Sequence, residues 1–146
     1  SIMADKHFAI LDDNNIVTDV ILLDVANEAE GIAQARNVKD NQSLTVVETF
    51  RDASNAETRY NFGGIGSVWD SENQAFHRPR RHASWTLDSN YIWQPPVARP
   101  TSYILEDNTY LIMQWNEAEQ RWDGYNPATE AVDYHWNAST LAWDSV

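Results

Sequence analysis

The stretch VWDSENQAF, residues 68–76, has an aromatic residue near each end, an acidic residue after the first aromatic, and a polar turn between them. The arrangement returns as QWNEAEQRW at 114–122 and HWNASTLAW at 135–143, with a longer version, SWTLDSNYIW, at 84–93. A four-residue loop in the first three stretches, and a three-residue loop at 88–90 in the longer one, would place two aromatic residues opposite each other across a hairpin. The predicted pairs are Trp69 with Phe76, Trp85 with Trp93, Trp115 with Trp122, and Trp136 with Trp143.

The residue after the first tryptophan of the seven-spaced hairpins is Asp70, Asn116 or Asn137. These side chains accept hydrogen bonds from turn amides, so the loop and the aromatic pair specify the same hairpin. An isolated hairpin is only marginally stable, and the hairpins are therefore expected to pack on one another or on another sheet. Two roles remain open: buried pairs would build a core or a subunit interface, and exposed pairs would stack on sugar rings or cationic ligands.

The amino-terminal region has a different pattern. Residues 8–11 and 16–23 predict two strands joined by the turn DDNN at 12–15, and SLTVVETFR at 43–51 predicts a third strand. Residues 25–37, rich in Ala, Glu and Gln, predict a short helix that Gly31 weakens by about 1 kcal/mol relative to alanine. The helix is therefore expected to pack on the hairpin, which gives a β-β-α-β layer.

The predicted fold class is α+β, mostly β: an amino-terminal antiparallel hairpin with one short helix, followed by a series of tryptophan-clamped hairpins. GGIG at 63–66 is interpreted as a bulge or a close backbone approach, because no helix follows to hold a phosphate. QPPVARP at 94–100 predicts a stiff connection that separates the two middle hairpins from the last two. Three segments are expected: 1–58 as the β-β-α-β layer, 59–100 as two hairpins with a basic loop, and 101–146 as two acidic hairpins.

The formal net charge is −12, which argues against a nucleic-acid partner because a phosphate backbone demands a basic surface. Residues 1–58 and 101–146 each carry a net charge of −7, whereas residues 59–100 carry +2. The positive charge is concentrated in HRPRRH at 77–82. This basic stretch is either a solvated loop or an electrostatic contact for an acidic partner or a neighbouring subunit. Its candidate contact residues are His77, Arg78, Arg80, Arg81 and His82.

The chain of 146 residues has no cysteine, which excludes disulfides and thiolate chemistry. No apolar run approaches the roughly 20 residues that cross a bilayer, and the start SIMADKHFAIL lacks the regions of a signal peptide, so a soluble protein without a membrane partner is expected. Ser1 and Ile2 precede Met3; whether they are a remnant ahead of the true start stays open, and the fold prediction does not use them.

No pattern selects a catalytic site. The four histidines, at 7, 77, 82 and 135, make no ligand pair of metal-binding spacing, and a nucleophile elbow is absent. The acidic residues lie mostly in turns, where capping accounts for them. Asn137 begins a glycosylation sequon, which carries little weight without a secretory context. We therefore expect a protein that is not an enzyme and has no catalytic residues, cofactor or metal.

Several of these residues resemble a family of small proteins encoded by tailed bacteriophages, especially marine ones such as cyanophages, usually described as structural or hypothetical. HFAILDDNNIVTDVI at 7–21 is similar to the family's opening, and EGIAQ at 30–34 resembles its short helix. The middle of the chain matches the family pattern most specifically, at Ile65, Gly66, Asp70, Phe76, Pro79, Ser84, Trp85, Leu87, Trp93, Pro95 and Pro100. The family's closing element resembles Trp115, Asn116, Glu117 and Trp122.

The chain departs from the family pattern at RPRRHAS, 78–84, and in the additional hairpin at 133–146. The resemblance implies a virion protein and transfers no catalytic residue. The expected function is that of a noncatalytic capsid decoration or tail accessory component, located in the virion, that binds other virion proteins and forms a homo-oligomer. The alternative is a host-attachment module that binds glycan through exposed tryptophan pairs.

Overall fold

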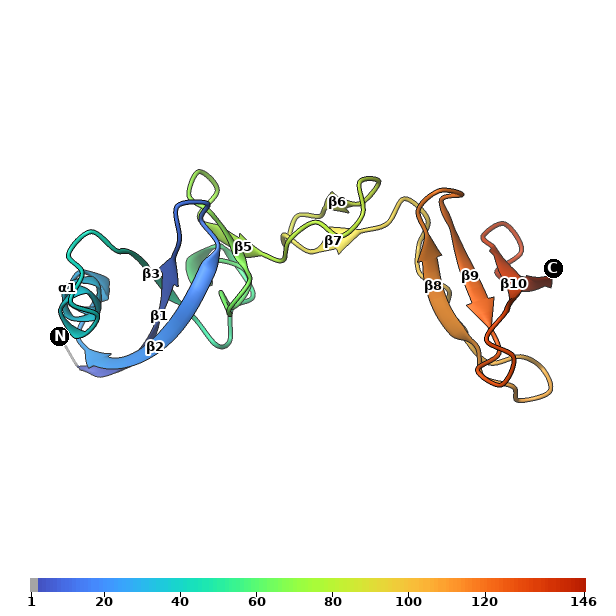
Figure 1. Ribbon diagram of the computed structural model, residues 1–146, viewed down its shortest axis with the longest axis horizontal. Helices are drawn as coiled ribbons and strands as arrows, with labels where there is room; N and C mark the ends of the chain where they lie inside the picture. The colour runs from blue at the N-terminus through green and yellow to red at the C-terminus, as the bar shows by residue number, and fades with distance from the viewer. Residues whose placement is uncertain (1–2) are drawn as a thin grey trace. The chain divides into compact units, whose positions relative to one another are not determined.

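The computed structural model describes residues 3–146; Ser1 and Ile2, which the fold prediction left out, lie outside the described residues. The fold is mostly β with one helix and several small antiparallel sheets, as the sequence predicts. In chain order the elements of Figure 1 are β1 (Ala4–Leu11), β2 (Val17–Val25), α1 (Glu28–Val38), β3 (Thr45–Thr49), the 3-10 helix η1 (Ala56–Thr58), β4 (Val68–Asp70), β5 (Ala75–His77), β6 (Thr86–Leu87), β7 (Trp93–Gln94), β8 (Ile112–Asn116), β9 (Arg121–Tyr125), β10 (Val132–Asn137) and β11 (Ala142–Ser145).

The chain divides into two compact units. The first unit runs to Pro79 and also contains Leu87–Trp93, and the second contains Arg80–Thr86 and Gln94–Val146. Residues 59–79 therefore belong with the amino-terminal layer, whereas the sequence analysis placed 59–100 in a segment of its own. Each unit has its own tryptophans and its own hydrophobic clusters.

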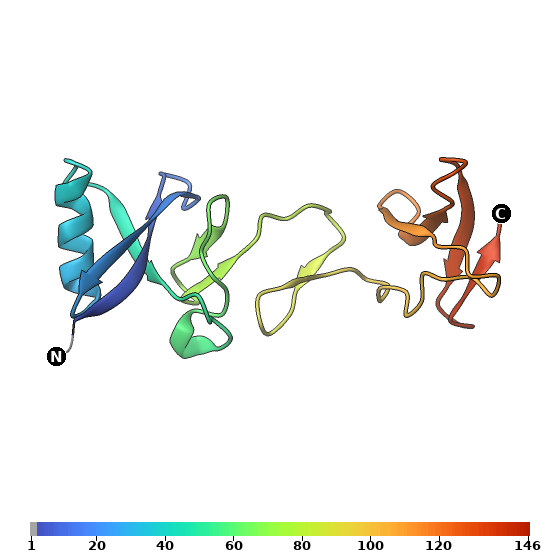
Figure 2. The same ribbon diagram turned by 90° about the horizontal axis from the view of Figure 1, so that it is seen from below.

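The first unit is built on an antiparallel sheet of order β2-β1-β3, with α1 alongside it (Figure 2). Side chains alternate along β1: Phe8 and Ile10 pack with Ala35 of α1, and the intervening residues face the other side of the sheet. The helix begins at Glu28 rather than at residue 25 because Asn27 caps it, with its side chain accepting from the Glu30 N–H at 2.9 Å. The β-β-α-β order expected from the sequence is confirmed.

The hairpin β4-β5 covers the other face of this sheet. Its Trp69 and Phe76 form one buried cluster with Ala9, Leu11, Val17 and Val47. Phe76 is fully buried, and a Cβ added at Gly63 would lie 2.5 Å from its ring. The close backbone approach predicted for GGIG is therefore present at Gly63.

The second unit holds an antiparallel sheet of order β11-β10-β9-β8. Trp115, Trp122 and Trp136 are its buried cluster, with Trp85, Val97, Met113 and Trp143 packed against it. Val97 lies within the proline-rich stretch, and its carbonyl accepts from the Trp122 indole N–H at 2.9 Å. The proline-rich stretch lies between the hairpins, as predicted, and it also packs on the core of the second unit, which was not predicted.

The predicted register of the fourth hairpin, β6-β7, is also wrong. The Asp88 N–H donates to the Ile92 carbonyl at 2.9 Å, and the Asp88 side chain accepts from the Ile92 N–H, so these bonds enclose residues 89–91 rather than the predicted loop 88–90. Trp85 precedes β6 and packs with Trp115 and Trp122, whereas Trp93 lies in β7 and packs edge-on with His77. Asp88 therefore caps a turn that lies one residue later than the spacing of the tryptophans suggested.

Candidate partner-binding site

The three seven-spaced hairpins share one geometry. Strand register places Trp69 opposite Phe76, Trp115 opposite Trp122, and Trp136 opposite Trp143, as the spacing predicts. The ring centroids of these pairs lie 4.5, 5.3 and 5.2 Å apart, and the rings are tilted by 46°, 67° and 62°. These are the inclined arrangements that aromatic quadrupoles favour.

The turns are closed by the residue after the first tryptophan. The Asp70 carboxylate accepts from the Asn73 N–H at 3.0 Å, and the Asn116 side-chain oxygen accepts from the Glu119 N–H at 3.0 Å. The Asn137 oxygen accepts from two N–H groups, at 3.0 and 3.1 Å. Each turn ends on a residue of positive φ: Gln74 at 52°, Gln120 at 49° and Leu141 at 54°.

The side-chain NH2 groups of the two asparagines, Asn116 and Asn137, also donate hydrogen bonds. Asn116 donates to the Asp123 carboxylate at 3.0 Å, and Asn137 donates to the Asp144 carboxylate at 3.1 Å. In the β4-β5 hairpin the residue after the second aromatic is His77, so the capping residue there can be an acid. The glycosylation-type Asn137 is therefore fully engaged in holding its own hairpin.

The aromatic pairs are mostly interior. Trp69, Phe76, Trp115, Trp122 and Trp136 are between 0 and 8% exposed, and Trp85, Trp93 and Trp143 are half-buried. Four indole N–H groups donate within their own units: Trp93 to the Arg78 carbonyl, Trp115 to Glu117, Trp122 to the Val97 carbonyl and Trp143 to the Ser102 carbonyl. These four indoles are thus hydrogen-bonded within their own units, whereas the Trp85 indole N–H is buried without a hydrogen-bond partner.

Glu117, in the β8-β9 turn, ties residues 80–86 to the tryptophan cluster. Its carboxylate accepts from the Ser84 N–H at 2.9 Å, the Ser84 hydroxyl at 2.6 Å and the Trp115 indole N–H at 2.8 Å. The hydrogen bonds from Ser84 hold the pKa of Glu117 below its ordinary value. Glu117 matches the family pattern, but no local pattern in the sequence predicted this role for it.

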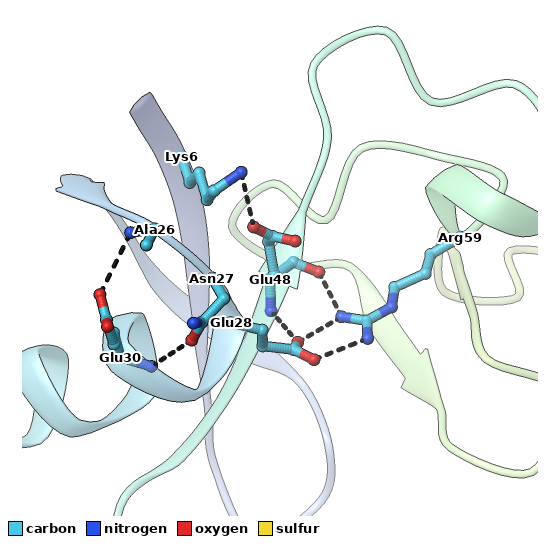
Figure 3. Close-up of polar contacts among 7 residues, drawn as sticks. All are labelled: Lys6, Ala26, Asn27, Glu28, Glu30, Glu48 and Arg59. Carbon is cyan, nitrogen blue, oxygen red and sulfur yellow. Dashed lines mark hydrogen bonds and ion pairs between the residues drawn. The ribbon is translucent and has the colours of Figure 1, made fainter. Parts of the chain in front are cut away.

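A second polar cluster lies in the first unit and was missed entirely (Figure 3). Arg59 donates to both carboxylate oxygens of Glu28, at 2.6 and 3.0 Å, and to the Glu48 carbonyl at 2.7 Å. The Glu48 N–H donates to Glu28 at 2.8 Å. Hydrogen bonding from Arg59 holds the pKa of Glu28 below its ordinary value, despite the opposing effect of burial. We call these three residues the arginine clamp.

The environment of the Glu48 carboxyl differs from that of the Glu28 carboxyl. One of its oxygens is buried without a hydrogen bond, and the Lys6 ammonium lies 3.9 Å from it. Burial raises the pKa of Glu48. The nearby cavity is shallow and lined by charges of both signs, including Asp5, Arg51 and Asp52, so it does not define a single ligand chemistry.

The basic stretch 77–82 crosses the boundary between the units after Pro79. In the first unit, Trp93 packs on His77, and Arg78 donates to the Ser67 hydroxyl at 3.2 Å. In the second unit, the His82 ring lies 5.2 Å from the Trp85 ring. Arg80 and Arg81 are exposed. The structure therefore separates the five candidate contact residues between two units.

An open pocket of about 540 Å³ lies in the second unit beside the last tryptophan pair. The half-buried Trp143 and the buried Trp136 form part of its wall, and two exposed acids, Glu106 and Asp107, form part of its rim. We call it the acidic aromatic pocket; its lining residues are Ser102, Ile104, Leu105, Glu106, Asp107, Tyr134, Trp136, Leu141, Ala142 and Trp143. The sequence analysis did not predict it, because residues 102–107 are distant in sequence from the hairpin they face.

Across residues 3–146, no group of three or more His, Asp or Glu side chains is placed to hold a metal ion. Within the same range, no helix is both long enough and apolar enough to cross a membrane. Comparison of the chain with family models, with curated proteins and with solved structures finds no match.

Proposed function

We propose that this chain is a noncatalytic phage virion protein, a capsid decoration or tail accessory component that binds other virion subunits. The proposal starts from the resemblance of the sequence to small tailed-phage proteins. It places the protein in the virion and makes its surface, rather than an enclosed catalytic cavity, the functional part.

The observation that carries the proposal is the use of the tryptophans as core. Five of the six aromatic residues in the seven-spaced pairs are no more than 8% exposed. In the second unit, tryptophan side chains supply most of the buried cluster that larger domains build from Leu, Ile and Val, and in the first unit Trp69 and Phe76 join an aliphatic cluster. A packed core in each unit holds a small surface rigid. Two small, rigid surfaces suit a protein that binds to a lattice of other subunits.

Exposed apolar side chains are available for contacts with other subunits. In the second unit these include Tyr103, Ile104, Tyr110, Ile112, Val132, Leu141 and Val146, which are 40–72% exposed. Tyr103 and Tyr110 also pack on each other, with ring centroids 5.8 Å apart. Aromatic residues are enriched at interfaces, and this exposed tyrosine pair makes the second unit the better candidate for the subunit contact.

Immunogold labelling of purified particles, from a phage that encodes the chain, tests the virion role. The expected result is regular labelling at one position on the capsid or tail, accompanied by the protein in mass spectra of the particles at a fixed ratio to the major capsid protein. An antibody against a nonstructural phage protein is the control. Particles free of the chain, from lysates that contain it, would overturn the proposal.

Glycan-binding host attachment is the second candidate, and one observation favours it. The half-buried Trp143 lines an open pocket whose rim carries hydroxyl and carboxylate groups, which can hydrogen-bond to sugars. If attachment is the function, host polysaccharide should shift the indole N–H signal of Trp143 and leave that of the buried Trp122 unchanged. Signals that are indifferent to polysaccharide would remove this candidate.

A further inference from the structure

The acidic aromatic pocket differs from the surroundings of the other two seven-spaced hairpins in one respect. The Arg59 guanidinium lies 5.4 Å from the centre of the Trp69 ring, and the Arg99 guanidinium lies 5.0 Å from that of Trp122. Both distances are within the roughly 6 Å of a cation–π contact. In the part of the chain that the structure describes, no arginine stacks on Trp136 or Trp143. The pocket lies beside that uncapped pair.

The chemistry of the pocket suits a cation with an apolar stem. Trp143 and Leu141 form an aromatic and an aliphatic part of the pocket wall, and Glu106 and Asp107 make the pocket negatively charged. Hydrogen bonds from Thr109 hold the pKa of Asp107 below its ordinary value, so this carboxylate is ionised at neutral pH. A guanidinium can stack on an indole and donate to carboxylates at the same time.

The carboxy-terminal segment does not supply that cation itself. Its one Lys or Arg residue, Arg121, forms an ion pair with the Asp123 carboxylate at 2.9 Å. Residues 101–146 carry a net charge of −7, whereas the basic stretch at 77–82 concentrates three arginines in four positions. Pro79 holds that stretch extended, and Arg81 within it is exposed. The charge complementarity is therefore between two surfaces of the same chain.

We propose that the acidic aromatic pocket receives the basic stretch of a second copy of this chain, with Arg81 as the side chain that enters between Trp143 and Glu106. This inference deepens the proposed function and rests on it, because it names the first subunit partner as another copy. The two surfaces differ, so the contact is heterologous and joins copies head to tail. A pocket of about 540 Å³ falls within the range of about 300 to 1,000 Å³ that accommodates such groups.

Sedimentation velocity of the full chain at low and high ionic strength tests the proposal. Wild type is expected to self-associate at low salt and dissociate at high salt, since exposed charge pairs are screened. Arg81→Glu and Glu106→Arg should each weaken self-association about tenfold or more, and the double variant should recover most of it. Glu119→Arg is the matched control, because it makes the same charge change in the turn of the neighbouring hairpin.

Leu141→Asn separates docking from folding. Asparagine tolerates the positive φ at this position, so the variant should keep its thermal stability while losing part of the apolar wall of the pocket. Weakened self-association in a fully folded variant is the expected result. Self-association unchanged in Leu141→Asn, Arg81→Glu and Glu106→Arg would overturn the proposal.

A synthetic peptide of residues 77–83, added to the monomeric Arg81→Glu chain, gives a second readout by NMR of the indole N–H groups. The Trp143 signal should shift with the peptide and not with the same peptide carrying Glu at position 81. A wild-type chain that stays monomeric at low salt and ignores the peptide would refute self-docking. If virions are nevertheless labelled, the virion role stands and only the self-contact fails; a Trp143 shift with host polysaccharide alone would assign the pocket to glycan.

Discussion

Gly31 lies where the helix α1 meets the ring of Phe8. A Cβ added at this position would lie 1.9 Å from the ring, which is closer than a Cβ atom and a nonbonded heavy atom approach each other in proteins. Glycine is a poor helix former, but its lack of a Cβ allows the helix to approach the sheet closely at Phe8. The sequence predicted the weakening of the helix and that it would pack, but not which side chain required the glycine.

Gly31→Ala is expected to lower the free energy of unfolding of the first unit by about 1–3 kcal/mol, because overpacking outweighs the gain in helix propensity. Chemical denaturation measures it. Gln34→Ala, at an exposed position of the same helix, should change stability by less than about 0.5 kcal/mol. A Gly31→Ala chain more stable than wild type would show that the Phe8 contact is not as tight as described.

Asn116 and Asn137 show why two hairpins need an amide where the third has an acid. Each asparagine accepts from its turn and donates to the aspartate that follows the second tryptophan. An acid at either position would keep the turn and place two carboxylates about 3 Å apart. Asp123 is 7% exposed, whereas Asp144 is exposed, so the two hairpins should respond differently.

Asn116→Asp is expected to destabilise the second unit by about 2–3 kcal/mol near neutral pH, and Asn137→Asp by less than about 1 kcal/mol. Repulsion raises the folded-state pKa of the carboxyl introduced at position 116. The penalty is thus present above that pKa and is relieved as the pH falls and the carboxyl takes up a proton. Urea titrations of both variants at neutral and acid pH measure this. Equal losses in the two variants at every pH would contradict it.

At the scale of elements, the hairpins were predictable because their contacts are local. The spacing of Trp115 and Trp122 fixes which residues oppose each other once the turn length is known. The pairing predicted for Trp85 and Trp93 was wrong because the turn lies at 89–91, one residue later than the predicted loop. Contacts such as Glu117 with Ser84, or Arg59 with Glu28, join residues 33 and 31 positions apart, and no local spacing signals them.

The arginine clamp joins three elements of the first unit. Glu28 lies in the first turn of α1, Glu48 lies in β3, and Arg59 follows η1 and also covers Trp69 of the β4-β5 hairpin. Arg59 caps the end of η1 with a positive φ of 61°, and Asn55 and Thr58 form the capping box at the start of η1. Bidentate recognition by one guanidinium thus links helix, sheet and hairpin.

Arg59→Lys should cost about 1–2 kcal/mol, since an ammonium cannot reproduce the fork or cover the indole as well. Thermal or chemical unfolding of the first unit measures the loss. Arg51→Lys, at an exposed position, is the control and should be neutral. An Arg59→Lys variant as stable as wild type would show that the clamp is dispensable.

The clamp also predicts a pH dependence. The folded-state pKa of Glu28 is lowered, so the stability it contributes is present above its unfolded-state pKa and is lost as the pH falls through the folded value. The stability difference between wild type and Glu28→Gln should therefore be largest near neutral pH and shrink in acid. A constant difference across that range would rule out the ionised pair as its source.

At the scale of the whole molecule, the two units have separate cores. None of the three hydrophobic clusters among the described residues contains side chains from both units. Proline-rich stretches often read as linkers, yet 94–100 packs into the second core through Val97. Composition alone could not reveal this, because an extended chain beside a cluster and a free linker have the same residues.

The two units are expected to unfold separately. Val17→Ala should lower the stability of the first unit alone, and Trp122→Ala that of the second alone, by about 2–5 kcal/mol each. Hydrogen exchange of backbone amides, read unit by unit, measures both. Equal loss of protection in both units from either substitution would mean that they fold as one cooperative body.

The central claim is that the buried tryptophans of the seven-spaced pairs are core side chains rather than ligand platforms, and hydrogen exchange of the indole N–H groups tests it most directly. Trp115 and Trp122, which are 7% and 3% exposed and donate to Glu117 and to Val97, should exchange slowly and keep their NMR signals when host polysaccharide is added. Rapid exchange of both groups, with shifts on adding polysaccharide, would contradict the account.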